Sequence, residues 1–92
     1  KPDYSRAILN LSAVYIKRGR NNEALTILNK LYIQKPEDID VMTNLGILFL
    51  RQKHYKKAEK IFTKALGNDP ENIKVLFNLA YLNKIQNRMD QA

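Results

Sequence analysis

The prolines of this chain recur at a fixed interval, and this interval limits what the chain can fold into. Pro2, Pro36 and Pro70 are each 34 residues apart. Other residue types keep the same step, namely Ala24, Ala58 and Ala92, Asn10, Asn44 and Asn78, and Leu11, Leu45 and Leu79. A period in this range indicates a stack of similar structural units. We therefore expect residues 1–92 to form a single array, with units at 5–38 and 39–72, a partial unit at 73–92, and the end of a preceding unit at 1–4.

Within a unit, the apolar residues follow the spacing of an α-helix. In the first unit one set shares a side of a helix and is expected to face the core: Ala7, Ile8, Leu11, Val14 and Tyr15. A second set follows a short polar segment and consists of Ala24, Ile27, Leu28 and Leu31. The Gly and Asn residues within 18–22 permit the left-handed conformation that ends a helix. Each unit is thus predicted to be two antiparallel helices, with a proline between one unit and the next.

Small and large residues also recur at fixed places in the unit. The eighth position holds small residues, Ser12, Gly46 and Ala80. The eleventh position holds large residues in Tyr15 and Phe49, and then departs from them in Asn83. Over the whole chain this pattern resembles the tetratricopeptide repeat, a helix-turn-helix unit of the same length. The resemblance implies an all-α fold, a right-handed solenoid of antiparallel helix pairs with about two and a half repeats.

The third unit is incomplete. A turn expected near Lys84 and Arg88 would place Ala92 just inside the second helix of that unit. Leu76, Leu79 and Leu82 would then lack the partner helix that the first two units possess. Because a repeat buries its apolar face against its neighbours, we expect this chain to be a segment of a longer solenoid, or to have its ends covered by other copies. On its own it is expected to self-associate or to be only marginally stable.

The first helix of each unit is expected to line a binding groove, because the resemblance implies that this helix faces the inside of the superhelix. The candidate residues are Arg6, Leu9, Asn10, Ala13 and Lys17 in the first unit, Asp40, Thr43, Asn44, Ile47 and Arg51 in the second, and Lys74, Phe77, Asn78, Tyr81 and Ile85 in the third. Exposed apolar residues among them would mark an interaction site. An alternative is that Phe77 and Tyr81 pack on a further repeat.

Asparagine occupies the sixth position of all three units. An amide side chain offers both a donor and an acceptor, and asparagine ladders occur in tetratricopeptide superhelices that bind extended peptides. The resemblance implies this role for Asn10, Asn44 and Asn78; the alternative is that these amides bond to neighbouring helices or to water. The family's clamp for acidic chaperone tails is not expected, because its first Lys and Asn would fall on Leu9 and Ala13.

The charge of the chain narrows the class of partner. Sixteen Lys and Arg against nine Asp and Glu give a net charge of +7, which favours acidic partners. A stripe of lysines is interpreted as a solvated helix face: Lys53, Lys57, Lys60 and Lys64. The expected function is a scaffold that binds a protein or an extended peptide in the groove. Two alternatives are self-assembly through repeat stacking and single-stranded RNA binding, which the lack of recurring aromatic residues disfavours.

The residues indicate neither catalytic nor metal chemistry. The chain has no Cys and one His, His54, which is interpreted as a solvated turn residue. We therefore expect no enzyme activity, no cofactor and no metal site. The longest apolar run, residues 46–50, is far shorter than the roughly 20 residues that a membrane-spanning helix needs. The residues do not specify a compartment, although the cytoplasm is favoured.

Overall fold

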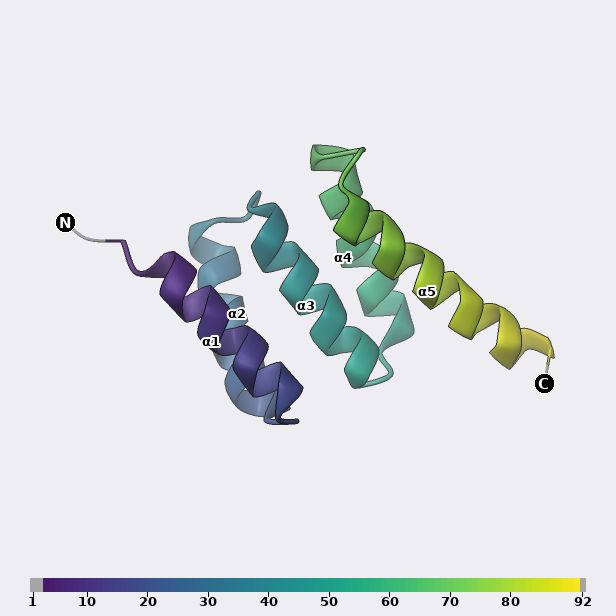
Figure 1. Ribbon diagram of the computed structural model, residues 1–92, viewed down its shortest axis with the longest axis horizontal. Helices are drawn as coiled ribbons and strands as arrows, with labels where there is room; N and C mark the ends of the chain where they lie inside the picture. The colour runs from purple at the N-terminus through teal and green to yellow at the C-terminus, as the bar shows by residue number, and fades with distance from the viewer. Residues whose placement is uncertain (1–2, 92) are drawn as a thin grey trace.

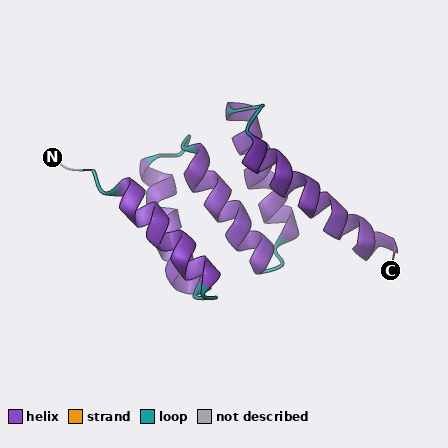
Figure 2. Ribbon diagram, viewed as in Figure 1, coloured by secondary structure: helices purple, strands orange, loops and turns teal. Residues whose placement is uncertain are grey.

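The computed structural model describes residues 3–91, and within that range it contains five α-helices and no strand (Figure 1, Figure 2). The helices are α1 (Ser5–Lys17), α2 (Asn21–Gln34), α3 (Ile39–Arg51), α4 (Tyr55–Asn68) and α5 (Ile73–Gln91). They pack as the antiparallel pairs α1/α2 and α3/α4, followed by α5. In Figure 1, α1, α3 and α5 form one layer, and α2 and α4 lie behind it. The all-α prediction is confirmed, and this stacking of pairs is consistent with a solenoid.

The two turns within the pairs share one backbone geometry. Gly19 has φ 74°, and Lys53, at the same position of the second unit, has φ 63°. The next residue donates its backbone N–H to the carbonyl five residues earlier, Arg20 to Tyr15 at 2.9 Å and His54 to Phe49 at 2.8 Å. This hydrogen bond ends a helix through a left-handed residue. Each second helix is thereby turned back onto its first helix, as the sequence predicts.

The turns between the units also repeat, and each caps the helix that follows. Asp38 accepts hydrogen bonds from the backbone N–H groups of Asp40 at 2.9 Å and Val41 at 3.2 Å, at the start of α3. At the equivalent position Asn72 accepts one from Val75 at 3.0 Å, at the start of α5. These side chains satisfy N–H groups that have no partner within the helix. Pro36 and Pro70 lie in these turns as predicted, whereas Pro2 lies outside the described residues.

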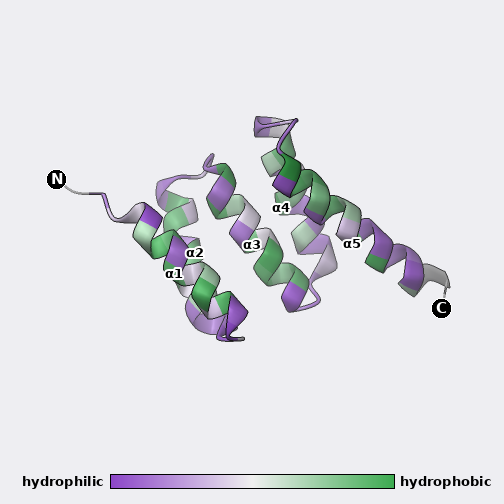
Figure 3. Ribbon diagram, in the orientation of Figure 1, coloured by the Kyte–Doolittle hydropathy of each residue, from purple (hydrophilic) through white to green (hydrophobic). Residues whose placement is uncertain are grey.

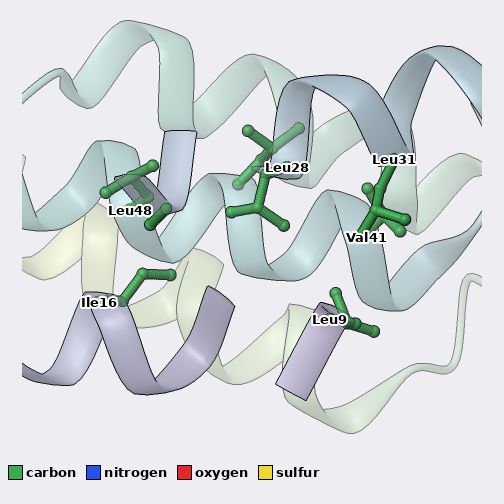
Figure 4. Close-up of a cluster of buried hydrophobic side chains, with 8 residues drawn as sticks. Leu9, Ile16, Leu28, Leu31, Val41 and Leu48 are labelled. Carbon is green, nitrogen blue, oxygen red and sulfur yellow. The ribbon is translucent and has the colours of Figure 1, made fainter. Parts of the chain in front are cut away.

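The core lies between the two layers and consists of two clusters, which share partly buried residues such as Phe49 and Ile61. One cluster joins α1, α2 and α3 and includes Leu9, Ile16, Leu28, Leu31, Val41 and Leu48 (Figure 4). A second joins α3, α4 and α5 around the fully buried Phe62. Close approach of α3 and α4 depends on Gly46, because a Cβ atom there would overlap the ring of Phe62. The small residue at the eighth position of the second unit is therefore required by packing.

The prediction of which side of α1 faces the core is wrong for most of the stripe, although Tyr15 does pack against the core. Ile8, Leu11 and Val14 are 38%, 42% and 43% exposed. The residues of α1 that are buried are Leu9, Ser12 and Ile16. In α3 the counterpart of Leu11, Leu45, is buried against α2. The difference arises because, among residues 3–91, no second helix covers the outer side of α1 in the way that α2 covers α3.

The turn predicted in the third unit is also wrong. α5 continues through Lys84 and Arg88 as a single helix of 19 residues, and Ala92 lies outside the described residues. The last turns of α5 are mostly hydrophilic (Figure 3), so they offer little apolar surface for a returning helix. Without that packing, extending the helix is favoured because each added residue gains a backbone hydrogen bond. A cavity of about 850 Å³ opens between the start of α4 and these last turns.

Candidate binding face of the first helices

The layer built from α1, α3 and α5, here called the first-helix face, carries two adjoining cavities. The smaller, of about 240 Å³, is lined by α1 and α3 through Ala13, Val14, Ile16, Lys17, Asn44, Ile47 and Arg51. The larger, of about 450 Å³, is lined by α3, the start of α4 and α5 through Ile47, Leu50, Arg51, Lys53, Tyr55, Phe77, Asn78, Tyr81 and Ile85. Ile47 and Arg51 line both cavities. The face is thus hollowed continuously across the three first helices.

Most of the predicted groove residues meet in these two cavities. Nine of the predicted groove residues line one or both of them: Ala13, Lys17, Asn44, Ile47, Arg51, Phe77, Asn78, Tyr81 and Ile85. Arg6, Asn10 and Lys74 are exposed but lie outside both cavities. Lys53 and Tyr55 were missed, because the groove was predicted from the first helices alone. Their place beside the turn that returns α4 onto α3 was the signal in the sequence that could have identified them.

The prediction that Leu9 lines the groove is wrong, because Leu9 belongs to the core. It is 6% exposed and packs in the cluster with Leu31 and Val41. The fifth position of a first helix points toward the first helix of the next unit, and Thr43, at the same position of α3, is buried as well. Phe77 is the third residue at this position and is 71% exposed. Among the described residues no further helix covers α5 there.

The three asparagines of the sixth position have different surroundings. Asn44 is partly buried and donates its amide N–H to the Ser12 hydroxyl at 3.2 Å, across the contact between α1 and α3. Ser12 in turn donates to the backbone carbonyl of Leu9 at 2.6 Å. Asn78 donates to the carbonyl of Lys74 in its own helix at 2.8 Å, and Asn10 is exposed. The three amides therefore do not form a uniform row in this structure.

The two ends of the first helices differ in how their charged side chains are paired. At one end the Arg6 guanidinium bonds to Asp40 at 2.6 Å and to Asp38 at 3.3 Å. The hydrogen bond with Asp40 and the nearby Asp38 charge raise the pKa of Arg6 above its usual value. At the other end lie Lys17 and Arg51, neither of which takes part in the ion pairs found among residues 3–91. Arg6 thus joins two repeats, whereas Lys17 and Arg51 present cations at the cavities.

His54 lies where the sequence places it, in the turn between α3 and α4, and it is exposed. Its backbone carbonyl accepts a hydrogen bond from the N–H of Ala58 at 3.0 Å, at the start of α4.

None of the helices within residues 3–91 combines the length and the apolar character needed to cross a membrane.

Comparison with known proteins identifies the family. No curated protein matches this sequence. The family model described as Tetratricopeptide repeat matches residues 3–71, which include the first unit and nearly all of the second. Repeats of this kind generally mediate protein–protein interaction and are typically non-catalytic scaffolds. With the period of the sequence, the paired helices and this match in agreement, the chain belongs to the tetratricopeptide repeat family.

Proposed function

We propose that this chain is an interaction scaffold that binds an extended peptide, or an extended segment of a protein, along the first-helix face. One observation carries the proposal: the two cavities adjoin at Ile47 and Arg51, so that a single chain segment could contact α1, α3 and α5 together. Concave sites with an apolar lining and a few polar groups are typical binding sites. The family of the chain supports the same class of function.

The residues of the face suggest what the bound segment contains. Ile47 is half-buried, and with Tyr81 it provides apolar contact for an apolar side chain of the peptide. Lys17 and Arg51 would pair with an acidic residue at the same end. Asn78 lines the larger cavity and keeps its amide oxygen outside the hydrogen bond to Lys74, so that this oxygen can accept from a peptide N–H. The proposed partner is therefore an extended segment with apolar and acidic side chains.

The proposal is tested by capturing partners with this protein, mapping the bound segment as a synthetic peptide, and measuring its affinity for the 92-residue chain. We expect Arg51→Glu to weaken binding about tenfold or more, because it replaces attraction by repulsion at both cavities. Asn78→Ala should weaken binding less. Lys30→Glu, on α2, changes the net charge equally and serves as the control. Equal affinities of the Arg51→Glu and Lys30→Glu variants would contradict the proposal.

Self-assembly is a second candidate, and the exposed apolar stripe of α1 favours it. Ile8, Leu11 and Val14 are accessible, whereas the counterpart of Leu11 in α3 is buried under α2. Covering this stripe with a helix of another copy would remove apolar surface from water. Sedimentation velocity at two concentrations tests this: self-assembly predicts a larger species at the higher concentration that Leu11→Lys abolishes. A concentration-independent monomer would exclude it.

A further inference from the structure

The layer of second helices carries a cavity that is separate from the first-helix face. It has a volume of about 350 Å³ and lies where α2, α3 and α4 meet, lined by Tyr32, Phe49, Lys57, Lys60, Ile61 and Lys64. We call it the lysine cleft. It shares no lining residue with the two cavities of the first-helix face. Its residues come from the two complete units, so its shape does not depend on either end of the array.

The floor of the lysine cleft is apolar and fixed by the core. Tyr32, Phe49 and Ile61 are half-buried, and each packs against both core clusters. Their outer surfaces remain accessible within the cleft. An apolar hollow of this size suits one large side chain of a partner. The floor therefore provides a place for an apolar anchor.

The lysines hold cationic groups directly over this floor. The Lys64 ammonium lies 4.9 Å from the centroid of the Tyr32 ring and donates a hydrogen bond to its hydroxyl. The Lys57 ammonium lies 5.8 Å from the centroid of the Phe49 ring. Such cation–π contacts favour these positions. With Lys60 one turn from each along α4, three cations surround the cleft.

The lining of the lysine cleft carries cations without carboxylates. The residues that line the cleft include no acid. Glu59 in α4 lies about 200° around the helix from Lys57, because successive residues are about 100° apart. Lysines brought together without carboxylates repel one another, and an anionic ligand would relieve that repulsion. The interpretation of this stripe as a plain solvated face is therefore incomplete, since three of its four lysines line the lysine cleft.

The lysine cleft does not follow from the repeat pattern itself. The positions of Lys57, Lys60 and Lys64 in the second unit correspond to Glu23, Thr26 and Lys30 in the first. Glu23 is paired with Arg20 there. The positions of Tyr32 and Phe49 correspond to Leu66 and Asn83 one repeat later. The combination of two aromatic rings with three lysines is thus particular to the contact between the first and second units.

We infer that the lysine cleft is a second binding site, which takes an acidic peptide with a large apolar side chain in its centre. The apolar side chain would rest on Tyr32, Phe49 and Ile61, and the flanking carboxylates would pair with the lysine ammonium groups. A nucleic acid fits less well. Its bases bind by stacking on aromatic rings that follow one another along a groove, whereas the cleft is a single hollow with only Tyr32 and Phe49 in its lining.

The test uses a defined probe, the fluorescein-labelled peptide Glu-Asp-Phe-Leu-Asp-Glu, and measures its affinity for the 92-residue chain by fluorescence anisotropy at physiological salt. Lys64→Glu should weaken binding about tenfold, because it turns one attraction into repulsion. Lys30→Glu is the matched control, since Lys30 holds the same position in the first unit and lies outside the cleft. It should change the affinity less than about twofold, since exposed charges at a distance are screened. Circular dichroism confirms that each variant keeps its helices.

Two further peptides test separately the contributions of ion pairing and of apolar contact to binding. Replacing Glu and Asp by Gln and Asn removes the charge, and replacing Phe and Leu by Ala removes the anchor. Each change should weaken binding about tenfold or more if apolar contact and ion pairing both contribute. Undiminished binding of the Ala peptide would overturn the inference, because attraction would then be due to charge alone.

The remaining outcomes separate this site from the first-helix face and from nucleic acid. Loss of probe binding in Arg51→Glu but not in Lys64→Glu would overturn the lysine cleft and leave the proposed function standing. A poly(U) oligonucleotide that binds more tightly than the peptide and is weakened by Lys64→Glu would also overturn it, in favour of RNA. Amide shifts in NMR confined to α4 and the end of α2, and absent from α1 and α5, would support the inference.

Discussion

The side-chain amide of Asn44 donates a 3.2 Å hydrogen bond to the hydroxyl of Ser12, one repeat earlier. We expect Asn44→Ala to destabilise the chain by about 1 kcal/mol, since Ser12 is fully buried and loses this partner. A double-mutant cycle with Ser12→Ala, measured by urea unfolding, should give a coupling energy of similar size. Strictly additive effects of the two substitutions would contradict a direct bond between the repeats.

Gly46→Ala should destabilise the chain by about 2 kcal/mol. The added Cβ would overlap the fully buried ring of Phe62, and this overpacking outweighs the better helix propensity of alanine. Gly67→Ala is the matched control in α4, because a Cβ at Gly67 meets no other atom nearby. It should stabilise the chain by about 0.5 to 1 kcal/mol. Thermal and urea unfolding of both variants measure the change in stability, which should have opposite signs in the two variants.

Leu9→Ala and Leu11→Ala test which of these two leucines of α1 belongs to the core. The structure places Leu9 there, whereas the apolar periodicity predicted Leu11. Leu9 is 6% exposed and its truncation leaves a cavity, so a loss of about 2 to 4 kcal/mol is expected. Leu11 is 42% exposed, and its truncation should cost less than about 1 kcal/mol in the monomer. Urea unfolding at low protein concentration gives both values. A larger loss of stability in Leu11→Ala than in Leu9→Ala would show that Leu11, and not Leu9, belongs to the core.

The stability of the chain should fall in acid partly through Asp3. Hydrogen bonds from Ser5 and then from Lys35 hold the pKa of the Asp3 carboxyl far below its ordinary value of 3.8. Because the pKa is lower in the folded state, this contribution is fully present above about pH 4 and is lost as the pH falls further. Asp3→Asn should therefore flatten part of the decline in urea midpoint below pH 4. Glu71→Gln serves as the control because it also removes one exposed carboxyl, one that forms none of the ion pairs found among residues 3–91, and it should flatten the decline less.

The features predicted best from the sequence are those that local chemistry determines. The repeat length, the turn at Gly19 and the prolines between units all depend on residues close together in the chain. The small residue at Gly46 is visible in the repeat pattern, and the structure shows that the approach of α3 to α4 requires it. In each case the residue type itself imposes the backbone conformation or the spacing.

The features missed depend on which neighbours are present. Leu9 and Leu11 lie about 200° apart around α1 and so face nearly opposite sides, and periodicity does not tell which side a neighbouring helix covers. The predicted turn near Arg88 required a helix able to pack back on α5. The lysine cleft brings together Tyr32 and Lys64, which are far apart in the sequence and belong to different units. Such contacts are set by tertiary packing, which a pattern within one repeat does not contain.

The two hairpin turns are alike in geometry but not in composition, and this gives the second hairpin a weak point. Lys53 adopts a left-handed backbone at φ 63°, which costs a side-chain-bearing residue roughly 1 to 2 kcal/mol more than it costs glycine. Amide exchange in the α3–α4 turn should therefore be faster than in the α1–α2 turn. Since Arg51 and Tyr55 flank Lys53, fraying there would dismantle the larger cavity of the first-helix face before the rest of the array loosens.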